Sequence, residues 1–308
     1  MSYNFEQMIF APKWYHYPVI VLFSPLAFCY AIFMFFRRQL TTKKNFDIPI
    51  ISVGNLIVGG SGKTPFVIEI ASRYTDVFVI SRGYGRKSKG LVEVSYKGNI
   101  LVDVEQSGDE AMLMAISLDE ASVVVSEDRK KAINFAKQKG AKLIVLDDGF
   151  SRVDIEKFEL ILEPEFIKNY LPLPVGAFRE FFFSKKYADV VAKEGINFVR
   201  EVSFENLKPR MLLVTAISNP KRLDKYLPEG IVQKVYLQDH QYFDEDEIKK
   251  LFIDCDADSI LCTSKDKVKM QKFTLPISEM KLKLKIDNAI MQKIEDYIRG
   301  SSSKEVDR

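Results

Sequence analysis

Short apolar runs alternate with longer amphipathic stretches along most of the chain after residue 45. Apolar runs of about four to eight residues, rich in β-branched side chains, are typical of strands covered on both faces. They are IPIISV (48–53), VFVIS (77–81), SVVVS (122–126), KLIVL (142–146), FELIL (158–162) and ADVVA (188–192). Helical stretches such as TPFVIEIASRY and DEAMLMAISL lie between them. This alternation predicts an α/β fold with a largely parallel sheet, helices on both faces and right-handed crossovers.

The pattern resumes near residue 210 with RMLLVTAIS (210–218), SILCTS and the alternating KLKLKI. We therefore expect a phosphate-loop core over 45–209 and a smaller α/β lobe over 210–300. Residues 1–44 would form an N-terminal membrane-anchoring helix and basic linker, and 301–308 a polar, frayed tail.

The N-terminal segment is uncharged from Trp14 to Phe36, apart from His16 if it were protonated. As a helix, Pro18 to Phe36 would be about 28 Å long, close to the thickness of a bilayer core. Aromatic residues flank its start and basic residues its end: Trp14, Tyr15 and Tyr17, then Arg37, Arg38, Lys43 and Lys44. The positive-inside bias places everything after residue 37 in the cytoplasm, at the bacterial inner membrane.

Two alternatives compete with membrane insertion or interfacial lodging of this segment. A signal peptide would need a basic start and small residues before the cleavage site, whereas LAFC has Phe28 there. A buried core helix is the other alternative, and Pro25 would kink a helix of either kind. The basic residues after the helix would hold anionic headgroups or simply be solvated.

The charge, cysteine and histidine content of the chain limits its possible partners, its redox compartment and its metal sites. A net charge of +3 is too small to indicate a nucleic-acid partner, and nothing indicates a protein partner. The three cysteines form no CxxC pair, which favours a reducing compartment. Two histidines exclude a multi-histidine metal site.

The stretch IVGGSGKTP follows an apolar strand and precedes a helical stretch, as a phosphate loop requires. Its backbone N–H groups would face phosphate oxygens, Lys63 would reach the terminal phosphates, and Thr64 would ligate Mg²⁺. The candidate nucleotide-binding residues are Gly59, Gly60, Ser61, Gly62, Lys63, Thr64 and Pro65. Ile57 stands where the usual first glycine would be. A tight strand–helix turn with an exposed lysine is the alternative.

Two acidic pairs supply candidate metal ligands. Asp147 and Asp148 close the strand KLIVL, and a carboxylate there would hold Mg²⁺ in a P-loop NTPase-like sheet. Asp109 and Glu110 begin the helical stretch after Gly108. One of them would join the metal while the other faces an acceptor hydroxyl. N-capping by acidic residues explains the second pair equally well.

Two loops supply further polar candidates. His240 beside Asp239 in LQDHQYF would help to take a proton from an alcohol, or would be a solvated loop histidine. Arg82 and Arg86 in SRGYGRKSKG would clamp phosphate, or be solvated. The segment LPLPVGAFREFFFSKK (171–186) is aromatic and basic, as a lipid-facing loop or a packed core segment would be.

Together these stretches resemble the tetraacyldisaccharide 4'-kinase family of lipid A biosynthesis. The motifs occur in order along most of the chain: VGNLIVGGSGKTP, SRGYGR, GDEAMLMA, LDDGF, LPVGAFRE, TAISNPKR, DHQYF and TSKDKVK. The glycine-doublet phosphate loop is itself the form that this family uses. The chain departs from the family pattern at Ser151, Arg152 and Gln241 and in TSKD, which affects secondary contacts.

The resemblance implies transfer of a phosphoryl group from ATP, with Mg²⁺, to the 4'-hydroxyl of a membrane-embedded tetraacyldisaccharide 1-phosphate, giving lipid IVA. It implies that Asp109 activates the hydroxyl with help from His240, and that Lys63 and Arg82 contact the transferring group or the substrate. The metal shell would be Thr64, Glu110, Asp147 and Asp148. The alternative from another class is a membrane-tethered P-loop NTPase switch, which would use water as its nucleophile.

Overall fold

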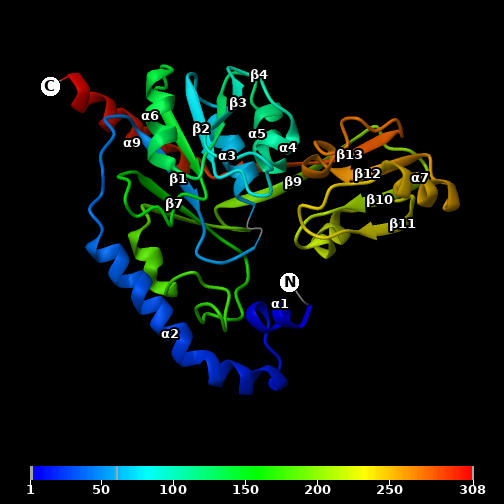
Figure 1. The fold of residues 1–308 in the computed structure, drawn as a ribbon, viewed down its shortest axis with the longest axis horizontal. Helices are drawn as coiled ribbons and strands as arrows, with labels where there is room; N and C mark the ends of the chain where they lie inside the picture. The colour runs from blue at the N-terminus through cyan, green and yellow to red at the C-terminus, as the bar shows by residue number, and fades with distance from the viewer. Residues whose placement is uncertain (1–2, 60–61, 307–308) are drawn as a thin grey trace. The chain divides into compact units, whose positions relative to one another are not determined.

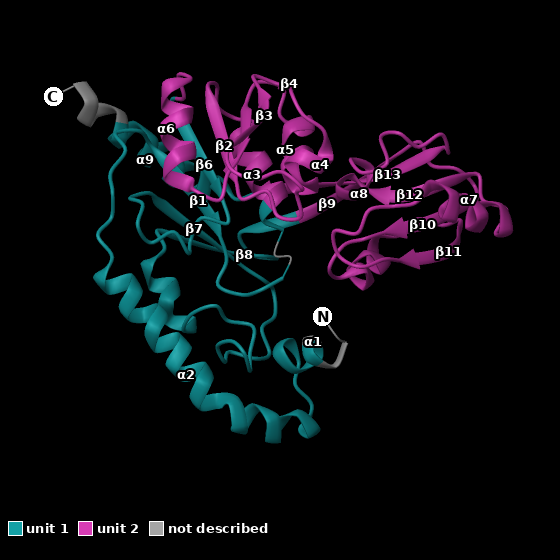
Figure 2. Cartoon of the chain, viewed as in Figure 1, with its two compact units in different colours: residues 1–63, 142–199, 286–308 teal, residues 64–141, 200–285 magenta. Residues whose placement is uncertain are grey.

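The computed structural model describes residues 3–59 and 62–306 of the 308-residue chain. The chain divides into two compact units, each assembled from segments far apart in the sequence (Figure 2). Unit 1 comprises residues 1–63, 142–199 and 286–308, and unit 2 comprises residues 64–141 and 200–285. The four segments expected from the sequence stay a prediction.

Unit 1 contains a run of parallel strands in the order β6-β1-β7-β8. Their bounds are β1 (Ile50–Gly54), β6 (Leu143–Asp147), β7 (Phe158–Glu163) and β8 (Val190–Lys193). Every residue of β1 and β6 is buried, as the continuous apolar runs predict. The helices of this unit are α1 (Tyr3–Phe10), α2 (Tyr17–Leu40) and α9 (Asn288–Val306), with short 3₁₀ segments at Trp14–His16 and Phe182–Tyr187.

The apolar N-terminal segment forms one long helix, α2, drawn in blue in Figure 1. Pro25 lies inside it. Among the described residues, the stretch Trp14–Leu40 is long and apolar enough to cross a membrane, with a mean hydropathy of 2.4 over its most apolar window. Length and composition alone are weak evidence, because a core helix or a signal sequence passes the same test.

Unit 2 contains the strand run β4-β3-β5-β2 and most of a smaller sheet. In the first run β2 (Val77–Ser81) is parallel to β5 (Ser122–Val125), while β3 (Val92–Tyr96) is antiparallel to β5 and to β4 (Asn99–Ile100). The helices that accompany these strands are α3 (Lys63–Ala71), α4 (Val104–Ser107), α5 (Asp109–Ser117) and α6 (Arg129–Gln138).

The smaller sheet has the order β11-β10-β12-β13-β9. Its strands are β9 (Phe198–Glu205), β10 (Met211–Thr215), β11 (Ile231–Tyr236), β12 (Ser259–Thr263) and β13 (Ile277–Ile286). A 3₁₀ segment (Pro220–Tyr226) and the helices α7 (Glu245–Asp254) and α8 (Ser264–Lys267) accompany it. A core of Leu212, Val214, Ile248, Ile260 and Cys262 lies between the sheet and α7.

The predicted α/β fold class is confirmed, and each apolar run that the sequence marked as a strand overlaps one. The helix α9 continues to Val306, through residues 301–306 of the segment expected to be a polar tail. Tyr297 anchors this helix, because its hydroxyl accepts a hydrogen bond from the Ile50 backbone N–H of β1 at 3.3 Å. The turns after Tyr297 therefore extend a helix that is already fixed in unit 1.

Candidate active site

The candidate phosphate loop lies between the end of β1 at Gly54 and the start of α3 at Lys63. Gly59 and Gly62 have φ values of 94° and 79°, a region that glycine enters without steric strain. Lys63, Thr64 and Pro65 occupy the first turn of α3, where backbone N–H groups have no intrahelical partner. Gly60 and Ser61 lie outside the described residues.

Lys63 is held at this loop by two side chains of unit 1. Its ammonium donates a hydrogen bond to Asn55 Oδ1 at 3.3 Å and lies 3.5 Å from Asp148 Oδ1. Arg179 Nη1 donates to both carboxylate oxygens of Asp148, at 3.1 and 2.9 Å. Burial raises the pKa of Asp148, but Lys63 and Arg179 outweigh it, so the pKa lies below its usual range.

Asp147 is the last residue of β6 and Asp148 follows it, so the pair lies at the carboxyl end of the strand, as predicted. Asp147 is buried at the last position of β6, in register with Val53 of β1. Two glycines let the DDGF turn pack closely on β1. A Cβ at Gly54 would lie 2.6 Å from Phe150 Cβ, and a Cβ at Gly149 would lie 2.6 Å from Ser52 Oγ.

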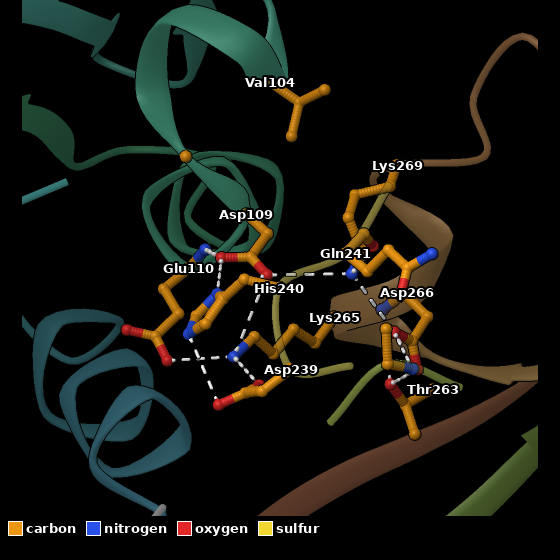
Figure 3. A network of polar contacts seen from close by, with 12 residues as sticks. Val104, Asp109, Glu110, Asp239, His240, Gln241, Thr263, Lys265, Asp266 and Lys269 are labelled. Carbon is orange, nitrogen blue, oxygen red and sulfur yellow. Dashed lines mark hydrogen bonds and ion pairs between the residues drawn. The ribbon is translucent and has the colours of Figure 1, made fainter. Parts of the chain in front are cut away.

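A second polar cluster lies within unit 2 around Asp109, the first residue of α5 (Figure 3). The Asp109 side chain is buried, with 4% exposed. His240 Nδ1 lies 2.9 Å from each of its carboxylate oxygens, and His240 Nε2 lies 3.6 Å from Asp239. A hydrogen bond from Nδ1–H to Asp109 leaves Nε2 as the basic nitrogen of a neutral ring.

Two lysines complete this cluster. Lys265 Nζ lies among three carboxylates: it donates to Glu110 Oε1 at 3.1 Å and is 3.8 Å from both Asp109 and Asp239. Lys269 Nζ lies 3.8 Å from Asp109 Oδ2, the same oxygen that Lys265 faces (Figure 3). Asp109 therefore faces an imidazole and two ammonium groups.

This arrangement favours an ionised Asp109. Burial raises the pKa of Asp109, but the His240 hydrogen bond and the charges of Lys265 and Lys269 outweigh it and hold the pKa below its usual value. The pKa of Lys265 is raised, because Glu110, Asp109 and Asp239 outweigh the opposing effect of burial.

Three of the sequence motifs converge at this cluster. A Cβ at Gly108 would lie 2.7 Å from the Tyr84 carbonyl oxygen, so the start of α5 abuts the SRGYGR loop. A Cβ at Gly85 would lie 3.8 Å from His240 Cβ, and the Tyr84 ring centroid is 5.0 Å from that of His240. The glycines of both motifs therefore let the backbone approach closely around His240.

The two arginines of the SRGYGR loop differ. Arg82 is exposed. Arg86 forms an ion pair with Glu127 at 2.5 Å and donates to the Gly90 carbonyl at 2.6 Å, so it holds the loop in shape. Of the two phosphate-clamp candidates, Arg82 is therefore the one whose side chain is available to a ligand.

The predicted metal ligands are divided between the units. Thr64 and Glu110 belong to unit 2, whereas Asp147 and Asp148 belong to unit 1. No group of three or more acidic, histidine or cysteine side chains suited to a metal was found among the described residues. The hydroxyl and carboxylate oxygens of the four candidates are nevertheless the donor type that Mg²⁺ prefers. The complete metal shell stays a prediction.

Sequence reasoning assigned no role to Lys265, Lys269 or Arg179. All three lie in quoted motifs, TSKDKVK and LPVGAFRE, so a signal was present. The motif letters do not say which carboxylate each cation faces, because the partners are distant in sequence: Lys265 is 155 residues from Glu110.

Comparisons with known proteins agree over almost the whole chain. The family described as tetraacyldisaccharide-1-P 4'-kinase matches residues 19–208 and 194–299. A tetraacyldisaccharide 4'-kinase of Helicobacter pylori (strain HPAG1) is 46% identical over 295 residues, covering 95% of this chain and 94% of the relative. The Aliarcobacter butzleri enzyme is 45% identical over 305 residues, covering 96% of each chain. The enzyme of Campylobacter jejuni (strain NCTC 11168) is 39% identical over 300 residues, covering 96% of this chain and 95% of the relative.

A solved structure is also similar. It is the crystal structure of LpxK from Aquifex aeolicus in complex with ATP, with a TM-score of 0.74 and 26% identity. The match covers 91% of this chain and 99% of the Aquifex chain.

Proposed function

We propose, because this chain belongs to the tetraacyldisaccharide-1-P 4'-kinase family, that it transfers the γ-phosphoryl group of ATP to the 4'-hydroxyl of a tetraacyldisaccharide 1-phosphate. The product would be lipid IVA, an intermediate of lipid A biosynthesis. The chain is a kinase, and no comparison supports the alternative of an NTPase switch. The observation that carries the proposed chemistry is the contact at 2.9 Å between buried Asp109 and half-buried His240.

ATP is the proposed phosphoryl donor, which the ATP complex of the similar Aquifex protein supports. The loop from Gly59 to Pro65 would bind its phosphates, with Lys63 at the terminal phosphates. Asn55 and Asp148 already hold the Lys63 ammonium at that loop. Arg82 would add a second positive charge on the transferring group or the substrate.

Thr64, Glu110, Asp147 and Asp148 would supply the oxygen ligands of Mg²⁺. When bound, the ion neutralises charge on the phosphate oxygens.

Asp109 would accept the proton of the 4'-hydroxyl. In phosphoryl transfer the protein mainly positions the reacting groups and stabilises charge, and a carboxylate accepts the hydroxyl proton. An ionised, weakly basic carboxylate is adequate for that task, and the hydrogen bond from His240 Nδ1 at 2.9 Å orients it and stabilises its charge. Lys265 and Lys269 stabilise the ionised carboxylate from 3.8 Å.

The acceptor would remain in the cytoplasmic face of the inner membrane, because its acyl chains cannot leave the bilayer. The long apolar helix α2 supports this location. A kinase that acts on such an acceptor needs its site held at the membrane surface.

The test is a mass-spectrometric assay with a defined tetraacyldisaccharide 1-phosphate in detergent micelles, with ATP and Mg²⁺. We expect addition of one phosphate to the acceptor, and ATP consumption that depends on the lipid. Nucleotide hydrolysis that is unchanged by the lipid, with no phosphorylated glycolipid, would favour the NTPase switch and contradict the proposal.

A further inference from the structure

One side of α2 is covered along the whole helix. Buried or half-buried residues recur every three or four positions, at His16, Ile20, Ser24, Ala27, Ala31, Phe35 and Arg38, and Tyr30, Met34 and Arg37 are also half-buried. Such spacing places them on one stripe of the helix. The stripe from His16 to Arg38 is about 33 Å long, which is about the thickness of a bilayer core.

Other segments of unit 1 cover this stripe at both ends. Near the start of α2, Ile20 and Ala27 pack in a cluster with Met8, Ile9 and Val175. The loop that contributes Val175 is itself tied to α1, because Asn169 Nδ2 donates to the Met8 carbonyl at 3.3 Å.

The end of α2 is fixed by polar contacts to the same unit. Arg38 forms a buried ion pair with Glu180 at 2.8 Å and lies over the Phe150 ring at 4.2 Å. Arg37 donates to the Ser151 carbonyl at 3.0 Å. Between the two ends, Phe28 and Phe35 contact Phe181 and Phe183, with ring centroids 6.4 and 6.5 Å apart.

This packing is incompatible with a helix that crosses the bilayer. The segment that covers α2, residues 164–181, contains no helix or strand and exposes Glu165 and Lys168. A crossing helix would carry this irregular backbone and these charges into the hydrocarbon, where backbone groups find no water.

Outside the covered stripe, much of the α2 surface is apolar and exposed. Its exposed side chains are Val21, Leu22, Phe23, Leu26, Phe28, Ile32, Phe33 and Phe36. The covering segment and the 3₁₀ segment that follows it add exposed aromatic residues of their own: Phe166, Tyr170, Phe182 and Phe183. Basic residues flank both elements: Lys43, Lys44, Lys185 and Lys186. Exposed apolar surface bordered by lysines matches the chemistry of an anionic bilayer surface.

We propose that unit 1 binds one leaflet through a two-part surface, with α2 lying along the membrane and residues 166–186 as the second element. Both ends of α2 then stay on the cytoplasmic side, and no part of the described chain crosses the bilayer. This inference rests on the proposed membrane location of the kinase.

The first test locates the N-terminus. An epitope tag ahead of residue 1 is exposed to protease in intact spheroplasts and in inside-out membrane vesicles. We expect the tag to survive in spheroplasts and to be removed in inside-out vesicles. Removal in spheroplasts would place the N-terminus outside the cytoplasm and overturn the proposal.

The second test measures binding of the full chain to phosphatidylethanolamine–phosphatidylglycerol vesicles by flotation. The double variant Phe166→Asp/Phe183→Asp should lower the partition coefficient at least about tenfold, because two apolar contacts with lipid are lost. The matched control is Ile253→Asp, which changes a 65% exposed apolar residue of α7 and should leave binding unchanged. Equal binding of the double variant and the wild type would show that residues 166–186 are not part of the membrane-binding surface.

A third measurement tests whether the exposed apolar face of α2 binds a bilayer or a second copy of the chain. Cys29 is exposed on α2, so a short bis-maleimide would join two chains if this face were a dimer interface. We expect no cross-link, and efficient cross-linking would overturn the proposal. A wild-type chain that fails to float would also overturn it, whereas the micelle assay reports on kinase activity separately.

Discussion

His240 Nδ1 lies 2.9 Å from both carboxylate oxygens of Asp109, although the two residues are 131 positions apart in the sequence. The carboxylate is buried and the imidazole is tilted against the Tyr84 ring. The pair is therefore held by packing as well as by its hydrogen bond, so its two members are expected to act together.

Replacing Asp109 tests the proposed proton acceptor. We expect Asp109→Asn to lower kcat by about 10²–10⁴-fold, since a neutral amide cannot take the hydroxyl proton. ATP binding, measured by equilibrium titration, should stay nearly unchanged. The matched control is Asp119→Asn, an exposed acid just beyond α5, which should keep full activity. A normal rate for Asp109→Asn would remove Asp109 from the chemistry.

Replacing His240 should have a smaller effect. We expect His240→Ala to lower kcat by about 10²-fold or less, because the carboxylate remains and only its assistance is lost. The double variant with Asp109→Asn should be little slower than Asp109→Asn alone, because the two residues serve one function. Losses that multiply would show that they act independently.

Lys269 is expected to position this pair. Its ammonium lies 3.8 Å from Asp109 and donates to the carbonyl of Gln241, the residue after His240, at 3.1 Å. Asp266, fully buried, holds Lys269 at 3.4 Å. We expect Lys269→Met to lower kcat by about 10- to 10²-fold with little change in KM for ATP, and Lys269→Arg to recover part of the loss.

A neighbouring lysine provides the control for this prediction. Lys267 pairs with Glu279 at 2.6 Å instead of with Asp109, so Lys267→Met should leave kcat unchanged. If both methionine variants lost activity equally, the effect of Lys269 would be one of general stability, which thermal unfolding would also show.

The lowered pKa of Asp109 makes a prediction about acid stability. A carboxyl group whose pKa is lower in the folded state stabilises the fold above its unfolded pKa, which is near 3.8. That contribution disappears as the pH falls through the lower, folded value. The difference in free energy of unfolding between wild type and Asp109→Asn should therefore be constant from pH 7 to about pH 5 and shrink below about pH 4. Denaturant titrations across this range provide the measurement.

Gly54 tests the close packing beneath the phosphate loop. Its added Cβ would lie 2.6 Å from Phe150 Cβ, so Gly54→Ala should destabilise the protein by about 1–3 kcal/mol through overpacking. Gly300→Ala is the matched control in α9, where an added Cβ meets nothing within 4 Å. It should stabilise the helix by up to about 1 kcal/mol. Measured by calorimetry, the Tm of Gly54→Ala should lie below that of the wild type and the Tm of Gly300→Ala above it.

The elements that were predictable are those with strong local patterns. β2 spans the predicted run Val77–Ser81, because every residue of it is buried and the pattern needs no distant information. β3 and β4 were missed, since their residues are partly exposed and their polar positions break the pattern. β9 was missed because its alternating residues include the charged Arg200, Glu201 and Glu205.

The candidate site was predictable only in part for a similar reason. The Gly-rich loop and the acidic pair at the start of α5 can be recognised from the local spacing of their residues. The partner of each charged group is set by the tertiary fold instead. Asp148 was predicted as a metal ligand, yet its observed contacts are Lys63 and Arg179, and only the folded chain brings Arg179 to it.

The Arg38–Glu180 pair has a practical consequence for anyone who wants a soluble form of this kinase. Deleting the first forty residues would strip Glu180, 2% exposed, of its cation and uncover Phe150 beside the DDGF turn. Truncation would thus damage the domain that it was meant to release. Replacing the exposed leucine and phenylalanine residues of α2 with polar residues would instead keep the contacts of Arg38 with Glu180 and Phe150.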